Sequence, residues 1–173
     1  VGGRSTEAGS AGETRRAELY DPSTESFSTT GTLKEWHSTG LRWASAPLMA
    51  NGMVLIIGDL SDVAELYDPS TGEFSRIGSM NSKHFGGTAT LLSSGEVLIA
   101  GGTMAQGLTE IYDPVAGTLR ISESMGLPRS GHTATLLPNG DVLVIGGWVG
   151  SSTPTTNSAE IYHYRYIPLI NHN

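Results

Sequence analysis

Apolar residues occur along this chain in short runs, and the stretches between the runs are rich in Gly, Ser, Thr, Asn and Asp. The most apolar runs end in glycine at 53–58, 97–102 and 142–147. No window of about 11 to 18 residues carries the i, i+3, i+4, i+7 spacing of an amphipathic helix. The pattern therefore predicts an all-β protein made of many short strands joined by tight turns.

One phrase returns four times, beginning at Ala17, Ala64, Thr109 and Ala159, and its last copy is the most altered. The glutamate in second place recurs at intervals of roughly 45 to 50 residues, a period typical of stacked or radial repeats. We therefore expect one repeat domain over 1–173. It divides into an incomplete repeat 1 (1–33), repeat 2 (34–80), repeat 3 (81–125) and a divergent repeat 4 (126–173).

Repeat 3 is expected to form four antiparallel strands. The second strand, at 96–102, is nearly continuously apolar, which favours burial on both faces. The fourth strand, at 117–125, is more polar, as suits an outer edge. The first and third strands are expected at 87–92 and 108–114.

Turn residues mark the ends of these strands. Gly95, and Gly140 in repeat 4, are expected to supply the positive φ of a hairpin after the first strand. Gly101 and Gly102 end the second strand and allow close backbone packing. Asp113 stands before a proline and ends the third strand, because proline cannot donate to the ladder.

These features together resemble the kelch repeat. They are a Gly-His pair at the start of a first strand (Gly131 and His132), a double glycine ending the second, and Glu-Leu/Ile-Tyr-Asp-Pro in the third. The resemblance covers nearly the whole chain and implies a β-propeller of four-stranded blades. It also implies a buried structural hydrogen bond for His132.

The ends of the chain are incomplete as propeller blades. About three and a half blades are present, whereas closed propellers need roughly four to eight. The missing blades would come from the same chain or from another copy. The outer strand of the last blade is expected at 165–170, or is supplied by another segment.

Residues that recur in every repeat are interpreted as structural, and residues that occur once are the better functional candidates. The recurring glutamates are expected to serve the fold, with pairing between blades as one role. The recurring tyrosines are expected to pack between blades, and the recurring aspartates to form turns. These three sets are Glu18, Glu65, Glu110 and Glu160; Tyr20, Tyr67, Tyr112 and Tyr162; and Asp21, Asp68 and Asp113.

Composition narrows the function classes. A formal net charge of −7 and a pI near 5.1 argue against nucleic acid, which rewards clustered Lys and Arg. The longest apolar runs are too short to insert into a membrane. The sequence has no cysteine, so it contains no disulfide, thiolate metal site or Cys nucleophile.

No motif indicates an enzyme, a metal site or a cofactor. The histidines lack metal-ligand spacing, and neither a G-x-S-x-G elbow nor a P-loop is found. We therefore expect a non-catalytic protein without metal or cofactor. The resemblance leaves one enzymatic alternative, because the family includes copper-radical oxidases of the galactose-oxidase type. Their catalytic residues would then lie outside this segment.

Irregular loops gather on one side of the expected propeller, which makes that side the candidate binding face. The unique aromatic and basic residues in these loops are the candidate ligand or partner contacts: Trp36, His37, Arg42, Trp43, Lys83, His84, Phe85, Arg129 and Trp148. Exposed Trp and Arg are common interface anchors. The alternative is that the tryptophans fill gaps between blades.

The preferred function is a binding or assembly scaffold that contacts a protein or glycan through this loop face. The family resemblance implies an extracellular or cell-surface location of the bacterial, secreted type. A second alternative is a structural subunit of a surface layer or filament, in which copies of the chain close one another's blades.

Overall fold

The structure is a computed structural model that describes residues 4–5, 12–13, 15–35, 45–58, 61–102, 105–150 and 155–164. These residues form fourteen strands in five antiparallel sheets, and none of them is helical. The all-β class expected from the sequence is therefore confirmed.

Four of the sheets each lie within one sequence repeat. Repeat 1 contains β3 (Arg16–Asp21) and β4 (Ser26–Thr32), preceded by a short ladder between β1 (Arg4–Ser5) and β2 (Gly12–Glu13). Repeat 2 contains β5 (Val54–Ile56), β6 (Val63–Asp68) and β7 (Glu73–Ser79). Its first strand is reduced to isolated bridges that pair Ser45 with Ile57 and Leu48 with Val54.

Repeat 3 has the four strands that the sequence predicts. They are β8 (Thr88–Leu91), β9 (Val97–Ala100), β10 (Thr109–Asp113) and β11 (Thr118–Ile121), in the spatial order β11-β10-β9-β8. The polar β11 lies at the edge, as expected. Repeat 4 contains β12 (Thr133–Leu136), β13 (Val142–Ile145) and β14 (Ala159–Tyr162). The expected outer strand at 165–170 lies outside the described residues.

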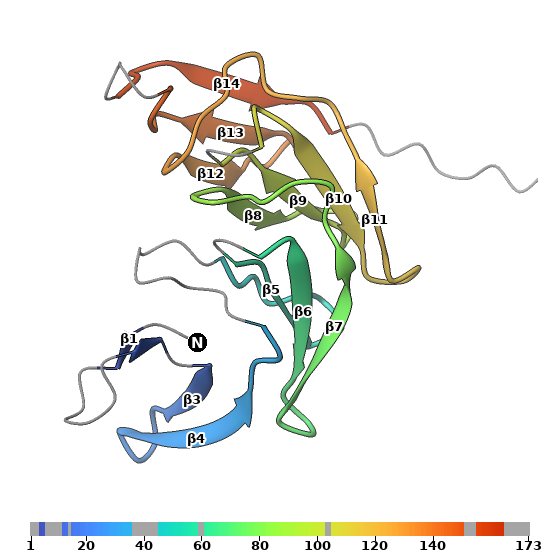
Figure 1. The fold of residues 1–173 in the computed structure, drawn as a ribbon. Helices are drawn as coiled ribbons and strands as arrows, with labels where there is room; N and C mark the ends of the chain where they lie inside the picture. Colours follow the sequence, from blue (N-terminus) through green and yellow to red (C-terminus); the bar gives the residue numbers. More distant parts are fainter. Residues whose placement is uncertain are drawn as a thin grey trace, which may run out of the picture.

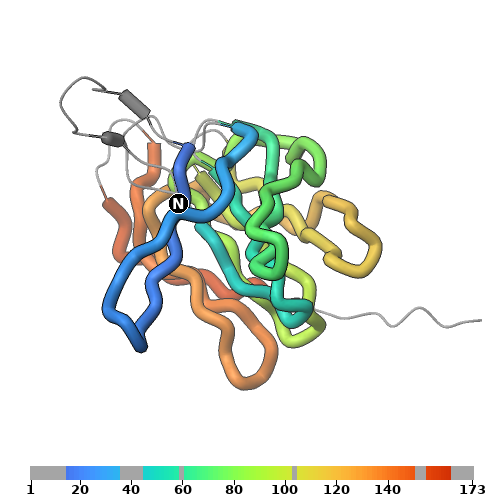
Figure 2. The backbone as a smooth tube through the Cα atoms, turned by 90° about the horizontal axis from the view of Figure 1, so that it is seen from below, coloured from blue at the N-terminus to red at the C-terminus, as the bar shows by residue number. Residues whose placement is uncertain are grey.

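The sheets follow one another in space in the order of the chain (Figure 1). β4 lies against β7, β7 against β11, and β8 beside β12. In the view turned by 90°, the hairpin turns project outward from the body of the molecule (Figure 2). Each repeat therefore packs on its neighbours in the sequence.

A hydrophobic cluster fills each of the three gaps between consecutive sheets. β9 lies between two gaps, with Val97 and Ile99 in one cluster and Leu98 and Ala100 in the next. All four of its residues are buried, which confirms the expectation of burial on both faces.

The recurring turns have the chemistry that the sequence indicates. Gly95 and Gly140 have φ of 89° in their hairpins. The Asp68 and Asp113 carboxylates each accept a backbone N–H two residues ahead, at 2.8 Å. The recurring aspartates are therefore turn formers, and Asp21 makes the same bond.

The turn of repeat 1 differs from the others at one backbone position. Glu25 has φ of 52°, whereas its counterparts in repeats 2 and 3 are Gly72 (φ 72°) and Gly117 (φ 67°). A residue with a Cβ is strained in this left-handed conformation, by about 1 to 2 kcal/mol.

We predict that Glu25→Gly raises the free energy of unfolding by about 1 kcal/mol, because glycine relieves the strain at a small entropic cost in the unfolded chain. The matched variant Gly72→Glu should lower it by a similar amount or more. Urea denaturation measures both. Equal stability of the three proteins would contradict the prediction.

Candidate functional site

In repeat 2, a glutamate of the third strand binds the segment that connects repeat 1 to repeat 2. Glu65 accepts the backbone N–H groups of Lys34 and Glu35 at 2.9 and 2.7 Å. The side chain of Glu65 is buried, so these bonds replace lost hydration of the carboxylate. These bonds fix β6 to the segment that connects the sheet of repeat 1 to the sheet of repeat 2.

The same arrangement returns in the next two repeats. Glu110 accepts the N–H groups of Asn81 and Ser82 at 2.9 and 3.3 Å. Glu160 accepts those of Gly126 and Leu127 at 2.7 and 3.1 Å. These bonds support the structural interpretation of the recurring glutamates.

His84, a candidate ligand contact, instead lies buried against Glu110. Its Nε2 is 3.0 Å from Glu110 Oε1, and its Nδ1 is 2.6 Å from the Gly101 carbonyl oxygen. Both ring nitrogens therefore lie within hydrogen-bond distance of an oxygen atom. Burial raises the pKa of the Glu110 carboxyl, but hydrogen bonds from His84 and Asn81 outweigh burial and hold that pKa below its usual value.

Arg129, at the equivalent place in repeat 4, is also buried. Its Nη2 donates to Glu160 at 2.6 Å and to Ser158 Oγ at 3.0 Å, and its Nη1 donates to the Gly146 and Ser158 carbonyls. Burial raises the pKa of Glu160, but the hydrogen bond from Arg129 and the two backbone N–H bonds bring it below its usual value. The guanidinium charge is thus balanced inside the protein.

His132 is buried and makes the structural hydrogen bond that the sequence indicates. Its Nε2 lies 3.0 Å from Thr88 Oγ1 in the neighbouring repeat. Its Nδ1 has no hydrogen-bond partner among the described residues. Burial, and then the nearby positive charge of Arg129, lower the pKa of His132 to about 4. The ring is therefore neutral at pH 7.

Glycines let the loops of repeats 3 and 4 meet backbone to backbone. The Gly131 N–H donates to the Gly86 carbonyl at 2.6 Å, and the Gly102 N–H donates to the Arg129 carbonyl at 2.8 Å. A Cβ on Gly101 would come within 2.6 Å of the Arg129 carbonyl oxygen, so no larger residue fits there. The expected close approach at the double glycine is confirmed.

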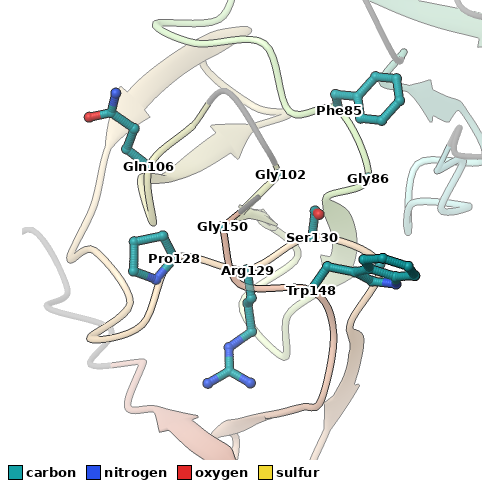
Figure 3. A pocket seen from close by; sticks show the side chains of 10 residues that line it. Phe85, Gly86, Gly102, Gln106, Pro128, Arg129, Ser130, Trp148 and Gly150 are labelled. Carbon is teal, nitrogen blue, oxygen red and sulfur yellow. The ribbon is translucent and has the colours of Figure 1, made fainter. Parts of the chain in front are cut away.

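These meeting loops surround a cavity of about 670 Å³. Its walls are largely apolar, and one hydroxyl, that of Ser130, points in among the lining residues (Figure 3). The lining residues are Phe85, Gly86, Gly102, Gln106, Pro128, Arg129, Ser130, Gly131, Trp148 and Gly150. The Arg129 side chain points away from Phe85 and Gln106 toward its internal partners (Figure 3).

Trp148 is the most accessible aromatic residue of this cavity, with 54% of its surface exposed. Its backbone is fixed by an antiparallel bridge, because Ser130 and Trp148 exchange N–H···O bonds at 3.0 and 2.7 Å. The indole is therefore held in place by its backbone while its ring stays open to a ligand.

The structure places the sequence candidates differently. Phe85, Arg129 and Trp148 line the cavity, and Lys83 is exposed beside the cavity residues in the chain. The buried side chains of His84 and Arg129 bond to Glu110 and Glu160. Trp36, His37, Arg42 and Trp43 lie outside the described residues.

Sequence reasoning did not single out Gln106 and Pro128, which also line the cavity. Both lie in irregular loops of the candidate face, but neither is aromatic or charged. Gln106 carries a second signal that only the structure gives, a φ of 48° in the left-handed region. Such strain at a non-glycine residue is found preferentially at functional sites.

No family model matches the chain, and no curated protein matches it. In the part of the chain that the structure describes, no three His, Cys, Asp or Glu side chains form a group that could hold a metal ion. The same residues include no helix long and apolar enough to cross a membrane.

We predict that His84→Ala lowers the free energy of unfolding by about 3 kcal/mol, because it leaves the buried Glu110 carboxylate and the Gly101 carbonyl without their contacts to the imidazole. Lys83→Ala, at the exposed neighbouring position, should change it by less than about 0.5 kcal/mol. Chemical denaturation at pH 7 measures both. Native stability of the His84 variant would show that the pair is dispensable for the fold.

We also predict that the free energy of unfolding falls as the pH is lowered from 6.5, the ordinary pKa of histidine, to about 4, the pKa of His132 in the folded chain. In this pH range the His132 side chain binds a proton in the unfolded chain but not in the folded chain. Lowering the pH therefore favours unfolding, by up to roughly 3 kcal/mol.

His132→Gln keeps a donor for Thr88 and should flatten this part of the pH profile. Denaturation from pH 7 to 4.5 gives the profile, and the His132 C–H resonances report its titration directly by NMR. Titration near the ordinary histidine value would contradict the prediction.

Proposed function

We propose that this chain is a non-catalytic binding module, built as a segment of a kelch-type β-propeller. Three observations support the architecture. The repeat recurs at roughly 45 to 50 residues, repeat 3 forms a four-stranded antiparallel sheet, and each sheet packs on its neighbours in the chain. The double glycines and His132 contribute the close contacts between repeats.

The cavity between repeats 3 and 4 carries the binding proposal. Its volume of about 670 Å³ falls within the range of roughly 300 to 1,000 Å³ that small-ligand sites occupy. Arg129, which lines it, is bonded to Glu160, and the neighbouring His84 is bonded to the buried Glu110. A cavity with apolar walls and balanced charges favours a neutral ligand.

A glycan fits this cavity better than a protein surface does. The rings of Phe85 and Trp148 project to the same side of the cavity (Figure 3). A flat, exposed indole suits the apolar face of a sugar ring, and the Ser130 hydroxyl can bond a sugar hydroxyl. A protein interface of standard size covers about 800 Å² on each partner and needs a broader surface than one cavity.

The proposal includes an extracellular or cell-surface location, which is where a glycan-binding protein meets its ligand. It rests here on the likeness to bacterial, secreted-type kelch repeats. Localisation by fractionation of the producing cells, with and without protease treatment of the surface, tests it separately from binding. Recovery only from the cytosol would contradict it.

We predict that the purified chain binds neutral oligosaccharides on a glycan array and that Trp148→Ala weakens the strongest interaction by roughly tenfold or more. Trp148→Phe keeps a flat ring and should retain most of the affinity. Lys83→Ala is the control outside the cavity and should leave the affinity unchanged. Calorimetric titration with the array hit measures all four proteins.

Unchanged affinity in Trp148→Ala would place the glycan elsewhere and contradict the proposal. An array without any hit would contradict the glycan ligand itself. A protein captured from the native source that loses affinity with Trp148→Ala would then identify the cavity as a protein-binding site.

A further inference from the structure

The segment that leads into β10 makes a tight turn at the rim of the cavity. The Leu108 N–H donates to the Ala105 carbonyl oxygen at 2.7 Å, and the two residues between them, Gln106 and Gly107, have φ of 48° and 85°. A turn with positive φ at both central residues is of type I′, which favours Asn-Gly, Asp-Gly or Gly-Gly at these places. The backbone conformation of Gln106 is therefore one that a residue with a Cβ disfavours.

The neighbours of this turn hold it in place. The Ala105 N–H donates to the Gly102 carbonyl oxygen at 3.2 Å, and the Gly107 carbonyl oxygen accepts the Met125 N–H at 2.8 Å. Ala105 is buried, and a Cβ on Gly107 would come within 3.1 Å of the Met125 carbonyl oxygen. The surrounding structure thus keeps Gln106 in the left-handed region, which is the condition under which such strain persists.

No hydrogen bond of the Gln106 side chain offsets this strain in the described part of the chain. The side chain is exposed, and its amide is not bonded to any described residue. Glu25, the other described non-glycine residue with positive φ, is also exposed, but it lies in the hairpin of repeat 1, whereas Gln106 lines the cavity. Strained residues without a structural role are found preferentially at ligand sites.

Gln106 lies across the cavity from the aromatic residues. Figure 3 shows Gln106 and Pro128 on one side of the cavity and Phe85 and Trp148 on the other. The Gln106 amide extends outward at the rim, and an exposed side chain of this length can turn toward a bound molecule within nanoseconds. A ligand stacked on the indole would therefore present a different edge to Gln106.

We propose that Gln106 determines the specificity of this cavity by binding two neighbouring hydroxyl groups of the ligand, a vicinal diol. This inference rests on the proposed function, because it concerns the ligand of the same cavity. A carboxamide carries an acceptor oxygen and an NH₂ group with two donors. Its oxygen accepts the hydrogen of one hydroxyl, and its NH₂ group donates to the oxygen of the next. The side chain is neutral, as suits a cavity that favours a neutral ligand.

Recognition is thereby divided between two kinds of contact. The indole of Trp148 offers a flat apolar surface, which accepts the apolar faces of different sugars alike. An amide that pairs with two hydroxyls discriminates against a ligand that lacks one of them, because the lost partner leaves a polar group unsatisfied. Asparagine would suit the turn better, but its side chain is one methylene group shorter. The glutamine therefore combines an unfavourable backbone with a longer reach.

The test measures stability and affinity on the same variants. Gln106→Asn gives the turn its preferred Asn-Gly pair but shortens the amide arm, and Gln106→Gly relieves the strain and removes the amide. Both should raise the midpoint of urea denaturation. Both should also weaken calorimetric binding of the strongest neutral oligosaccharide from the glycan array, by roughly tenfold for Gln106→Gly. A gain in stability together with a loss of affinity is expected of a residue that is strained for binding.

A second arm of the test varies the ligand. Monodeoxy derivatives of the same oligosaccharide, each lacking one hydroxyl, are titrated into the wild-type chain and into Gln106→Gly. Two derivatives that lack neighbouring hydroxyls should bind the wild-type chain more weakly than the parent does. The same two should bind Gln106→Gly as tightly as the parent does, because the amide that reads those hydroxyls is gone. This coupling assigns the diol to Gln106.

The matched control is Glu25→Gly, which relieves the same kind of strain outside the cavity and should raise the stability without changing the affinity. Unchanged affinity in Gln106→Gly, with Trp148→Ala still weakened, would overturn the role of Gln106 and leave the glycan proposal standing. A loss of stability in Gln106→Gly would overturn it too, because it would show a structural role. An array without any hit would overturn both proposals.

Discussion

A glutamate carboxylate that accepts two successive backbone N–H groups is the interaction on which the arrangement of the repeats depends. Glu65, Glu110 and Glu160 each accept such a pair from the segment that connects two sheets. Glu65 and Glu110 are fully buried, whereas the side chain of Glu160 is partly exposed. The carboxylate in turn needs compensation, because burial disfavours its charge.

The compensation explains why His84 and Arg129 occupy equivalent places in repeats 3 and 4. Each lies four residues before the first strand and meets the glutamate of its own repeat, with a histidine in one case and an arginine in the other. Both side chains are buried, so these polar groups are withdrawn from the surface. The cavity is left with largely apolar walls, Trp148 and the Ser130 hydroxyl.

The repeat architecture also sets the difference between the interior and the ends of the molecule. Each interior sheet buries both faces, since it has a neighbour on either side. Among the described residues, the first and last sheets carry the same residue types on one face without such a neighbour. Tyr67 and Tyr20 occupy the same place in their repeats, so their different burial reflects the presence or absence of a described sheet in front of them.

The sequence alone determined the strands, the turns and the division into repeats, because these depend on local rules. Alternating and continuous apolar runs, glycine at positive φ and Asp-Pro at strand ends act within a few residues of one another. Recurrence also identified the glutamates as structural. Only the tertiary structure decided that His84 and Arg129 are buried partners of those glutamates and that Phe85, Pro128 and Trp148 converge on one cavity. Those outcomes join residues that are far apart in the chain, and a unique residue in a loop looks the same in the sequence whether it faces solvent or a carboxylate beneath it.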